Sequence, residues 1–162
     1  LAQPQLLQID RLLEDAGAQS LRRVCILGAY VKRRVNLALI CEKKAAVPAD
    51  ELAHCLRESL IYLTQYGVVC ALYHDGQGSV SSRDAQLAYD FFEDCVEAAL
   101  PSLSALMVRL VCGGRLSIRL MLEDASGVPN AEKYARAGRL TLDDADGGQC
   151  ATLVFDRGGD RI

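Results

Sequence analysis

Two glutamates, Glu93 and Glu97, stand four residues apart in a segment whose apolar spacing predicts a helix over 83–100. Side chains at this spacing lie on one face of a helix. A carboxylate there could bind Mg²⁺, which prefers oxygen ligands. The same pattern is also that of the solvated face of an amphipathic helix, and both interpretations stay open.

A second candidate is the string Leu122 to Gly127, which reads Leu-Glu-Asp-Ala-Ser-Gly and follows a strand expected over 115–122. Asp, Ser and Gly are residues that turns prefer, so the string predicts a turn after the strand. Whether Asp124 also serves a ligand stays open at this point.

The cysteines predict no metal or disulfide framework. There are seven of them, an odd number, and no two form a C-x-x-C pair. Zinc-ribbon and thioredoxin-like sites require such pairs. Most of these cysteines stand among Val, Leu, Ile and Ala, which is typical of reduced, buried cysteines in a cytosolic protein.

Basic residues cluster on a helix expected over 20–41. They are Arg22, Arg23, Lys32, Arg33 and Arg34. One explanation is a solvated helix face near acidic neighbours. The other is contact with an acidic partner protein, or with anionic lipid headgroups if a membrane segment lies upstream.

Composition narrows the class of protein. The chain has 162 residues, 51% of them hydrophobic, and a net charge of −3, so disorder is excluded and nucleic acid is not an expected partner. The longest apolar run, 24–31, has eight residues, whereas a membrane span needs about 20. We therefore expect a cytoplasmic location with no membrane segment. The start at Leu1 is expected of a fragment of a longer protein.

The elements that must position these residues fall into two parts. Up to about residue 67 the pattern predicts helices, and after it strands and one long helix. The expected elements after residue 67 are a strand over 68–74, the helix over 83–100, a hairpin of 105–111 with 115–122, and a hairpin of 139–142 with 150–155. Segment 123–137 is expected to be polar and irregular. This order predicts an α+β fold, a two-layer α/β sandwich, with a helical hairpin before it.

In this element order the chain resembles the cytoplasmic portion of a sensor histidine kinase, in which a helical hairpin precedes an ATPase domain of the histidine-kinase-like (Bergerat) type. The resemblance covers about 20–155. It is carried by the strings 30–37, 56–60, 91–97 and 105–110. It implies three segments: a helical, dimerisation-like segment over 1–66, an ATPase-like sandwich over 67–156 and a polar tail over 157–162.

The resemblance implies roles for four residues. Glu93 matches the catalytic glutamate of the family's long helix. Glu97 stands where the family has an asparagine that holds Mg²⁺ beside the phosphates of ATP. Asp124 matches the aspartate that accepts a hydrogen bond from the adenine amino group, and Gly127 matches a glycine of the box that follows it. ATP and Mg²⁺ are the implied cofactors.

The chain departs from the family pattern in three places. A carboxylate at Glu97 adds repulsion beside a triphosphate, and the second glycine-rich box is not found between Gly127 and Gly138. The helix over 20–41 contains no histidine. His54 lies on the next helix and is followed by Cys55, where the family's phosphoacceptor is followed by an acidic residue, so His54 is a phosphoacceptor or an ordinary surface histidine. We therefore expect impaired phosphotransfer.

These observations leave several functions open. The first is the ATP-binding domain of a signalling protein similar to sensor histidine kinases. The second is a catalytically inactive, dimerising or protein-sequestering module of the same fold, similar to anti-sigma factors. The third is an unrelated small α+β regulatory domain. We expect a homodimer through the N-terminal helices, because apolar residues there require a partner helix, and a response regulator or another signalling protein as a partner.

Overall fold

The computed structural model describes residues 2–14, 17–127, 129–130 and 132–156, so the expected polar tail lies outside the described residues. The helices are α1 (Gln3–Glu14), α2 (Ala18–Lys43), α3 (Ala49–Tyr66), α4 (Ser82–Ala99) and α5 (Glu132–Ala135). The strands are β1 (Ala46–Pro48), β2 (Val69–Asp75), β3 (Ser79–Ser81), β4 (Ala105–Val111), β5 (Ser117–Glu123), β6 (Gly138–Ala145) and β7 (Gly148–Phe155).

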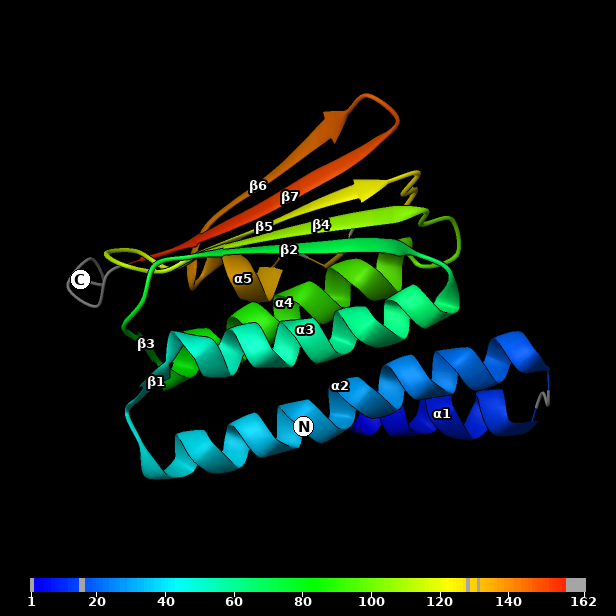
Figure 1. Ribbon diagram of the computed structural model, residues 1–162, viewed down its shortest axis with the longest axis horizontal. Coiled ribbons are helices and arrows are strands. Elements are labelled where there is room, and N and C mark those ends of the chain that lie inside the picture. Colours follow the sequence, from blue (N-terminus) through cyan, green and yellow to red (C-terminus); the bar gives the residue numbers. More distant parts are fainter. Residues whose placement is uncertain (1, 15–16, 128, 131, 157–162) are drawn as a thin grey trace.

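The main sheet has five strands in the order β2-β4-β5-β7-β6, and helices cover one of its faces (Figure 1). β2 and β4 are parallel, with α4 in the connection between them, and the other neighbours are antiparallel. In Figure 1, α3, α4 and α5 lie directly against the sheet, and α2 and α1 lie below them. The predicted α/β sandwich preceded by a helical hairpin is therefore confirmed.

A second sheet of two strands, β1 and β3, was not predicted. Val47 pairs with Val80 at its centre, and both side chains are buried. The hydroxyl of Ser82 donates to the carbonyl of Lys44 across the same junction (2.5 Å). Since β1 leads into α3 and β3 leads into α4, this small sheet fixes the starts of the two helices that support the main sheet.

The ends of α3 and α4 follow local signals. Gly67 ends α3 with a φ of 109°, which glycine adopts without strain, and its amide bonds back to Leu63 and Thr64. Ser81 caps α4 by accepting from the amide of Asp84 (3.1 Å). Pro48 holds the cap position of α3, and Asp50 lies in the first turn of this helix.

One hydrophobic core joins the hairpin to the sheet. Tyr30 and Leu37 of α2, Leu56 of α3 and Phe92 of α4 belong to the same buried cluster as Leu120 of β5. α3 packs against both α2 and β2. The helical hairpin thus rests on the sandwich through shared side chains, and α2 lies close enough to α4 to cover part of its surface.

Candidate functional site

The two glutamates singled out by the sequence lie on the face of α4 that α1 and α2 cover. Glu93 is only 1% exposed, and Glu97 is partly buried. With its amide nitrogen turned toward Glu97, Gln8 of α1 donates to Glu97 Oε2 (3.3 Å) and accepts from Nη2 of Arg23 on α2 (2.8 Å). The pair therefore lies beneath the N-terminal helices.

Burial changes the protonation of this pair. It raises the pKa of the Glu93 carboxyl well above its ordinary value, and the neighbouring Glu97 raises it further. Burial also raises the pKa of Glu97, against the opposing effect of Arg23. The Oε1 atom of each carboxylate finds no donor among the described groups. A neutral Glu93 can donate a hydrogen bond to Glu97, so the structure favours one proton shared by the pair.

Asp94, between the two glutamates in sequence, faces α5 instead. The Tyr134 hydroxyl donates a hydrogen bond to it, and Nζ of Lys133 lies 3.3 Å from Oδ2 of Asp94. The Tyr134 ring is fully buried against Phe91, with ring centroids 5.2 Å apart. The segment expected to be irregular thus contains a short helix that is anchored on α4.

Asp124 and Gly127 lie in the connection between β5 and α5. The Asp124 carboxylate is exposed and accepts from the Ser104 hydroxyl at the start of β4 (2.5 Å). Gly127 passes directly over α4, because a Cβ at Gly127 would lie 2.0 Å from the carbonyl oxygen of Ala98. Gly127 therefore lies against Ala98, the residue after Glu97 in α4. The Asp124 carboxylate is hydrogen-bonded to Ser104, the residue before β4.

A polar network that the sequence did not reveal joins α2 to α4. Arg34 binds Asp90 through Nε and Oδ1 (2.6 Å) and through Nη2 and Oδ2 (3.2 Å), and its Nη1 donates to Gln86 (2.7 Å). The Tyr30 hydroxyl donates to the same Asp90 carboxylate (2.8 Å). The sequence could have suggested this network only through the i,i+4 spacing of Gln86 and Asp90.

Most arginines of the basic cluster on α2 bind acidic or polar side chains of this same chain. Arg33 forms an ion pair with Glu58 of α3, and Arg34 forms one with Asp90 of α4. Arg23 donates to Gln8, as described above. The structure therefore favours acidic and polar neighbours within the chain over an external partner for these three arginines.

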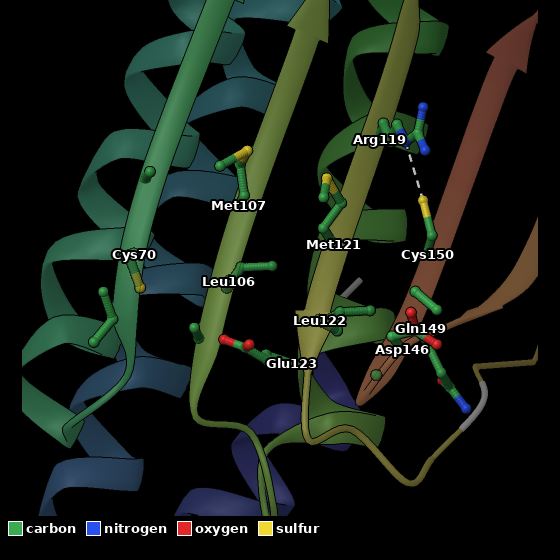
Figure 2. Close-up of a pocket in the computed structure, with 15 residues that line it drawn as sticks. Cys70, Leu106, Met107, Arg119, Met121, Leu122, Glu123, Asp146, Gln149 and Cys150 are labelled. Carbon is green, nitrogen blue, oxygen red and sulfur yellow. Dashed lines mark hydrogen bonds between the residues drawn. The ribbon is translucent and has the colours of Figure 1, made fainter.

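The face of the main sheet that the helices leave open carries an apolar groove of about 350 Å³ (Figure 2). Both methionines of the chain, Met107 and Met121, are direct cross-strand partners there and are 48% and 46% exposed. Figure 2 also shows Arg119, whose Nε donates to Sγ of Cys150 (3.0 Å) at the side of the groove. Exposed apolar patches of this kind mark contact surfaces.

The two histidines lie apart from these groups. His54 is exposed on α3 and lines a groove between α2 and α3, together with Glu51 and Arg33. His74 lies at the end of β2, with Nδ1 3.9 Å from the Asp50 carboxylate. Within the described residues, no group of three or more His, Cys, Asp or Glu side chains is placed to hold a metal ion.

Comparison with known proteins identifies the fold. No protein-family profile and no curated protein sequence matches the chain. Among solved structures, a bacterial phosphotransferase aligns with a TM-score of 0.56 and 9% identity, covering 93% of this chain and 88% of that one. The histidine kinase domain of the blue-light-activated histidine kinase from Erythrobacter litoralis EL346 aligns with a TM-score of 0.52 and 12% identity, covering 94% and 95%.

The chain has the fold of a histidine kinase domain. The resemblance inferred from the element order is therefore confirmed at the level of the fold. In this histidine-kinase fold, α1, α2 and α3 precede β2, and α3 also lies directly against the sheet, as α4 does. Among the described helices, none is both long and apolar enough to cross a membrane.

From the buried pair, Glu93 and Glu97, we predict how the free energy of unfolding depends on pH. Because the pKa of Glu93 is raised in the folded chain, the folded chain keeps a proton that the unfolded chain releases once the pH exceeds about 4.3. The free energy of unfolding therefore falls as the pH rises above that value. Glu93→Gln removes this proton linkage and should raise stability at pH 7 by on the order of 1 kcal/mol, or about 2–4 °C in Tm.

Thermal unfolding followed by circular dichroism from pH 4 to pH 8 measures this effect. The variant and the parent chain should converge near pH 4, where the carboxyl is neutral in both states. Glu42→Gln, at an exposed position of α2, is the control and should leave the pH dependence unchanged. A lower Tm for Glu93→Gln at pH 7 would contradict the proposed protonation.

Proposed function

We propose that this chain is a signalling module with a histidine-kinase fold that does not transfer phosphate and that acts as a homodimer through its helical hairpin. The observation that carries the proposal is the burial of Glu93 and Glu97 beneath α1 and α2. These are the residues to which the resemblance assigned catalysis and Mg²⁺ binding. A carboxyl pair that shares a proton under two helices supports a structural role instead.

The residues present do not fit Mg-ATP. A cation at Glu97 would require carboxylate oxygens that are open to it, whereas Gln8 of α1 already donates to Oε2 of the partly buried Glu97. The Asp124 carboxylate, assigned to adenine, already accepts a hydrogen bond from Ser104 through Oδ2. The backbone at Gly127 lies against Ala98 and leaves no room there even for a methyl group. We therefore derive no nucleotide chemistry for this chain.

An ATP-binding domain with impaired phosphotransfer is the second candidate, and the fold itself favours it. It would require α1 to leave Glu97 and the connection at Gly127 to move away from α4. A response regulator or another signalling protein as the partner, and a cytoplasmic location, belong to both proposals.

Exposed apolar residues on the hairpin support the homodimer. Leu21, Val35 and Leu39 are exposed on α2, and Ile61 is exposed on α3. Leu21 and Val35 are fourteen residues apart, two heptads, so they lie along one side of α2. A second copy of the hairpin would bury this stripe in a four-helix arrangement.

The absence of phosphotransfer can be tested with ATP and tripolyphosphate. We expect Mg-ATP to raise the Tm no more than Mg-tripolyphosphate does at the same millimolar concentration, because Gln8 covers Glu97 and the backbone at Gly127 lies against α4. A site for ATP filled at a hundred times its Kd would instead add ~2.7 kcal/mol. Incubation with γ-labelled ATP should leave the protein unlabelled. A stabilisation specific to ATP that Asp124→Asn abolishes would favour the second candidate.

The dimer can be tested with a matched pair of substitutions. Val35 is 39% exposed on the hairpin, and Val69 is 73% exposed on the edge strand β2. We expect Val35→Asp to halve the mass measured by analytical ultracentrifugation, because a charge in the buried stripe disrupts the contact, and Val69→Asp to leave it unchanged. Circular dichroism verifies that both variants fold. A monomeric parent chain would refute the homodimer.

A further inference from the structure

A cleft of about 430 Å³ lies between α2, α4 and the segment of α5, and neither Glu93 nor Glu97 lines it. Its lining residues are Arg34, Arg83, Gln86, Leu87, Lys133 and Arg136. Four of the six carry a positive charge, and they come from three separate elements. A cluster of cations brought together by the fold, rather than by one stretch of sequence, is the feature that requires an explanation.

Two of the cations, Arg34 and Lys133, bind carboxylates of α4, and these contacts fix the positions of their side chains. Asp90 binds the Arg34 guanidinium in a two-pronged contact, and Gln86 accepts a third hydrogen bond from it. These bonds use three of the five N–H groups of Arg34, so two remain for a ligand. Lys133 lies 3.3 Å from Asp94 and stacks over the Tyr134 ring. Both cations are therefore preorganised.

The other two cations, Arg83 and Arg136, are exposed and form no ion pair within the described part of the chain. Asp84, the residue after Arg83, interacts with it electrostatically but lines a different cavity. The cleft thus holds four cations against the two carboxylates of Asp90 and Asp94. Counting the residues that line the cleft and the two carboxylates that bind Arg34 and Lys133, the surplus is two positive charges, and Leu87 adds an apolar wall.

We propose that this cleft binds the dianionic phosphate group of a small phosphate monoester. The charge of a dianion matches the surplus, and guanidinium groups bind phosphate oxygens through paired hydrogen bonds. Arg83 precedes Glu93 by ten residues on α4, which is about 15 Å along the helix axis. None of the residues assigned to a nucleotide lines the cleft, so the inference does not depend on the proposed loss of phosphotransfer.

Phenyl phosphate and phenyl sulfate test the proposal, because they share a shape but carry two charges and one charge near neutral pH. In a ¹H–¹⁵N NMR titration we expect phenyl phosphate to shift the amides of Gln86, Leu87 and Arg136 along a saturating curve. Phenyl sulfate should bind at least tenfold more weakly. Equal binding of the two compounds, or shifts that never saturate, would overturn the proposal.

Two double variants distinguish specific binding in the cleft from nonspecific attraction to positive charge. Arg83→Gln with Arg136→Gln removes the surplus charge without breaking the contact of Arg34 with Asp90, and should weaken phenyl phosphate binding at least tenfold. Arg22→Gln with Arg57→Gln removes the same charge from exposed positions of α2 and α3 and should leave the binding unchanged. Equal weakening in both double variants would show diffuse attraction and refute the site. An unchanged Tm verifies that each variant folds.

Discussion

The acidic face of α4 is the constraint on which the remaining structure depends. Asp90 holds Arg34 and Tyr30 of α2, Asp94 holds Tyr134 and Lys133 at α5, and Glu97 bonds to Gln8 of α1. The opposite face of α4 is apolar and packs on the sheet. A buried charge is tolerated only when it is paired and hydrogen-bonded, so breaking any of these contacts leaves a costly unpaired group. One helix thus fixes three other helices relative to the sheet.

This use of α4 also limits the chemistry available at its surface. A carboxylate that orients a nucleophile or holds a cation must keep oxygens free for it, and the oxygens of Asp90 and Asp94 accept bonds from the chain itself. Glu93 and Glu97 share their environment with Arg23 and Gln8 rather than with solvent. The same packing leaves cations, not anions, at the remaining opening between α2, α4 and α5. The charge pattern of this surface therefore differs from the one that the resemblance implied.

Long elements with clear ends could be predicted from the sequence. The limits of β4 agree with the residues expected, and Gly67 ends α3 at the predicted change from helices to strands. The last hairpin runs further than expected: its strands reach Ala145 and begin again at Gly148. Polar residues such as Asp143 and Asp144 had suggested a long turn, but an edge strand accepts them on its open side. β1, β3 and α5 were missed because three or four residues are too few to establish a period.

The site was harder to predict because spacing identifies which residues share a face but not what covers it. Residues 90, 93, 94 and 97 follow helical spacing, and an open pocket, solvent or another helix would produce the same sequence pattern. The partners that decide between them, Gln8, Arg23 and Arg34, come from helices more than fifty residues away in the chain. Arg34 is among the most buried charged side chains described, although its sequence neighbours Lys32 and Arg33 suggested a solvated face. The tertiary pairing of α2 with α4 therefore determines the chemistry of this surface, and local sequence signals did not reveal that pairing.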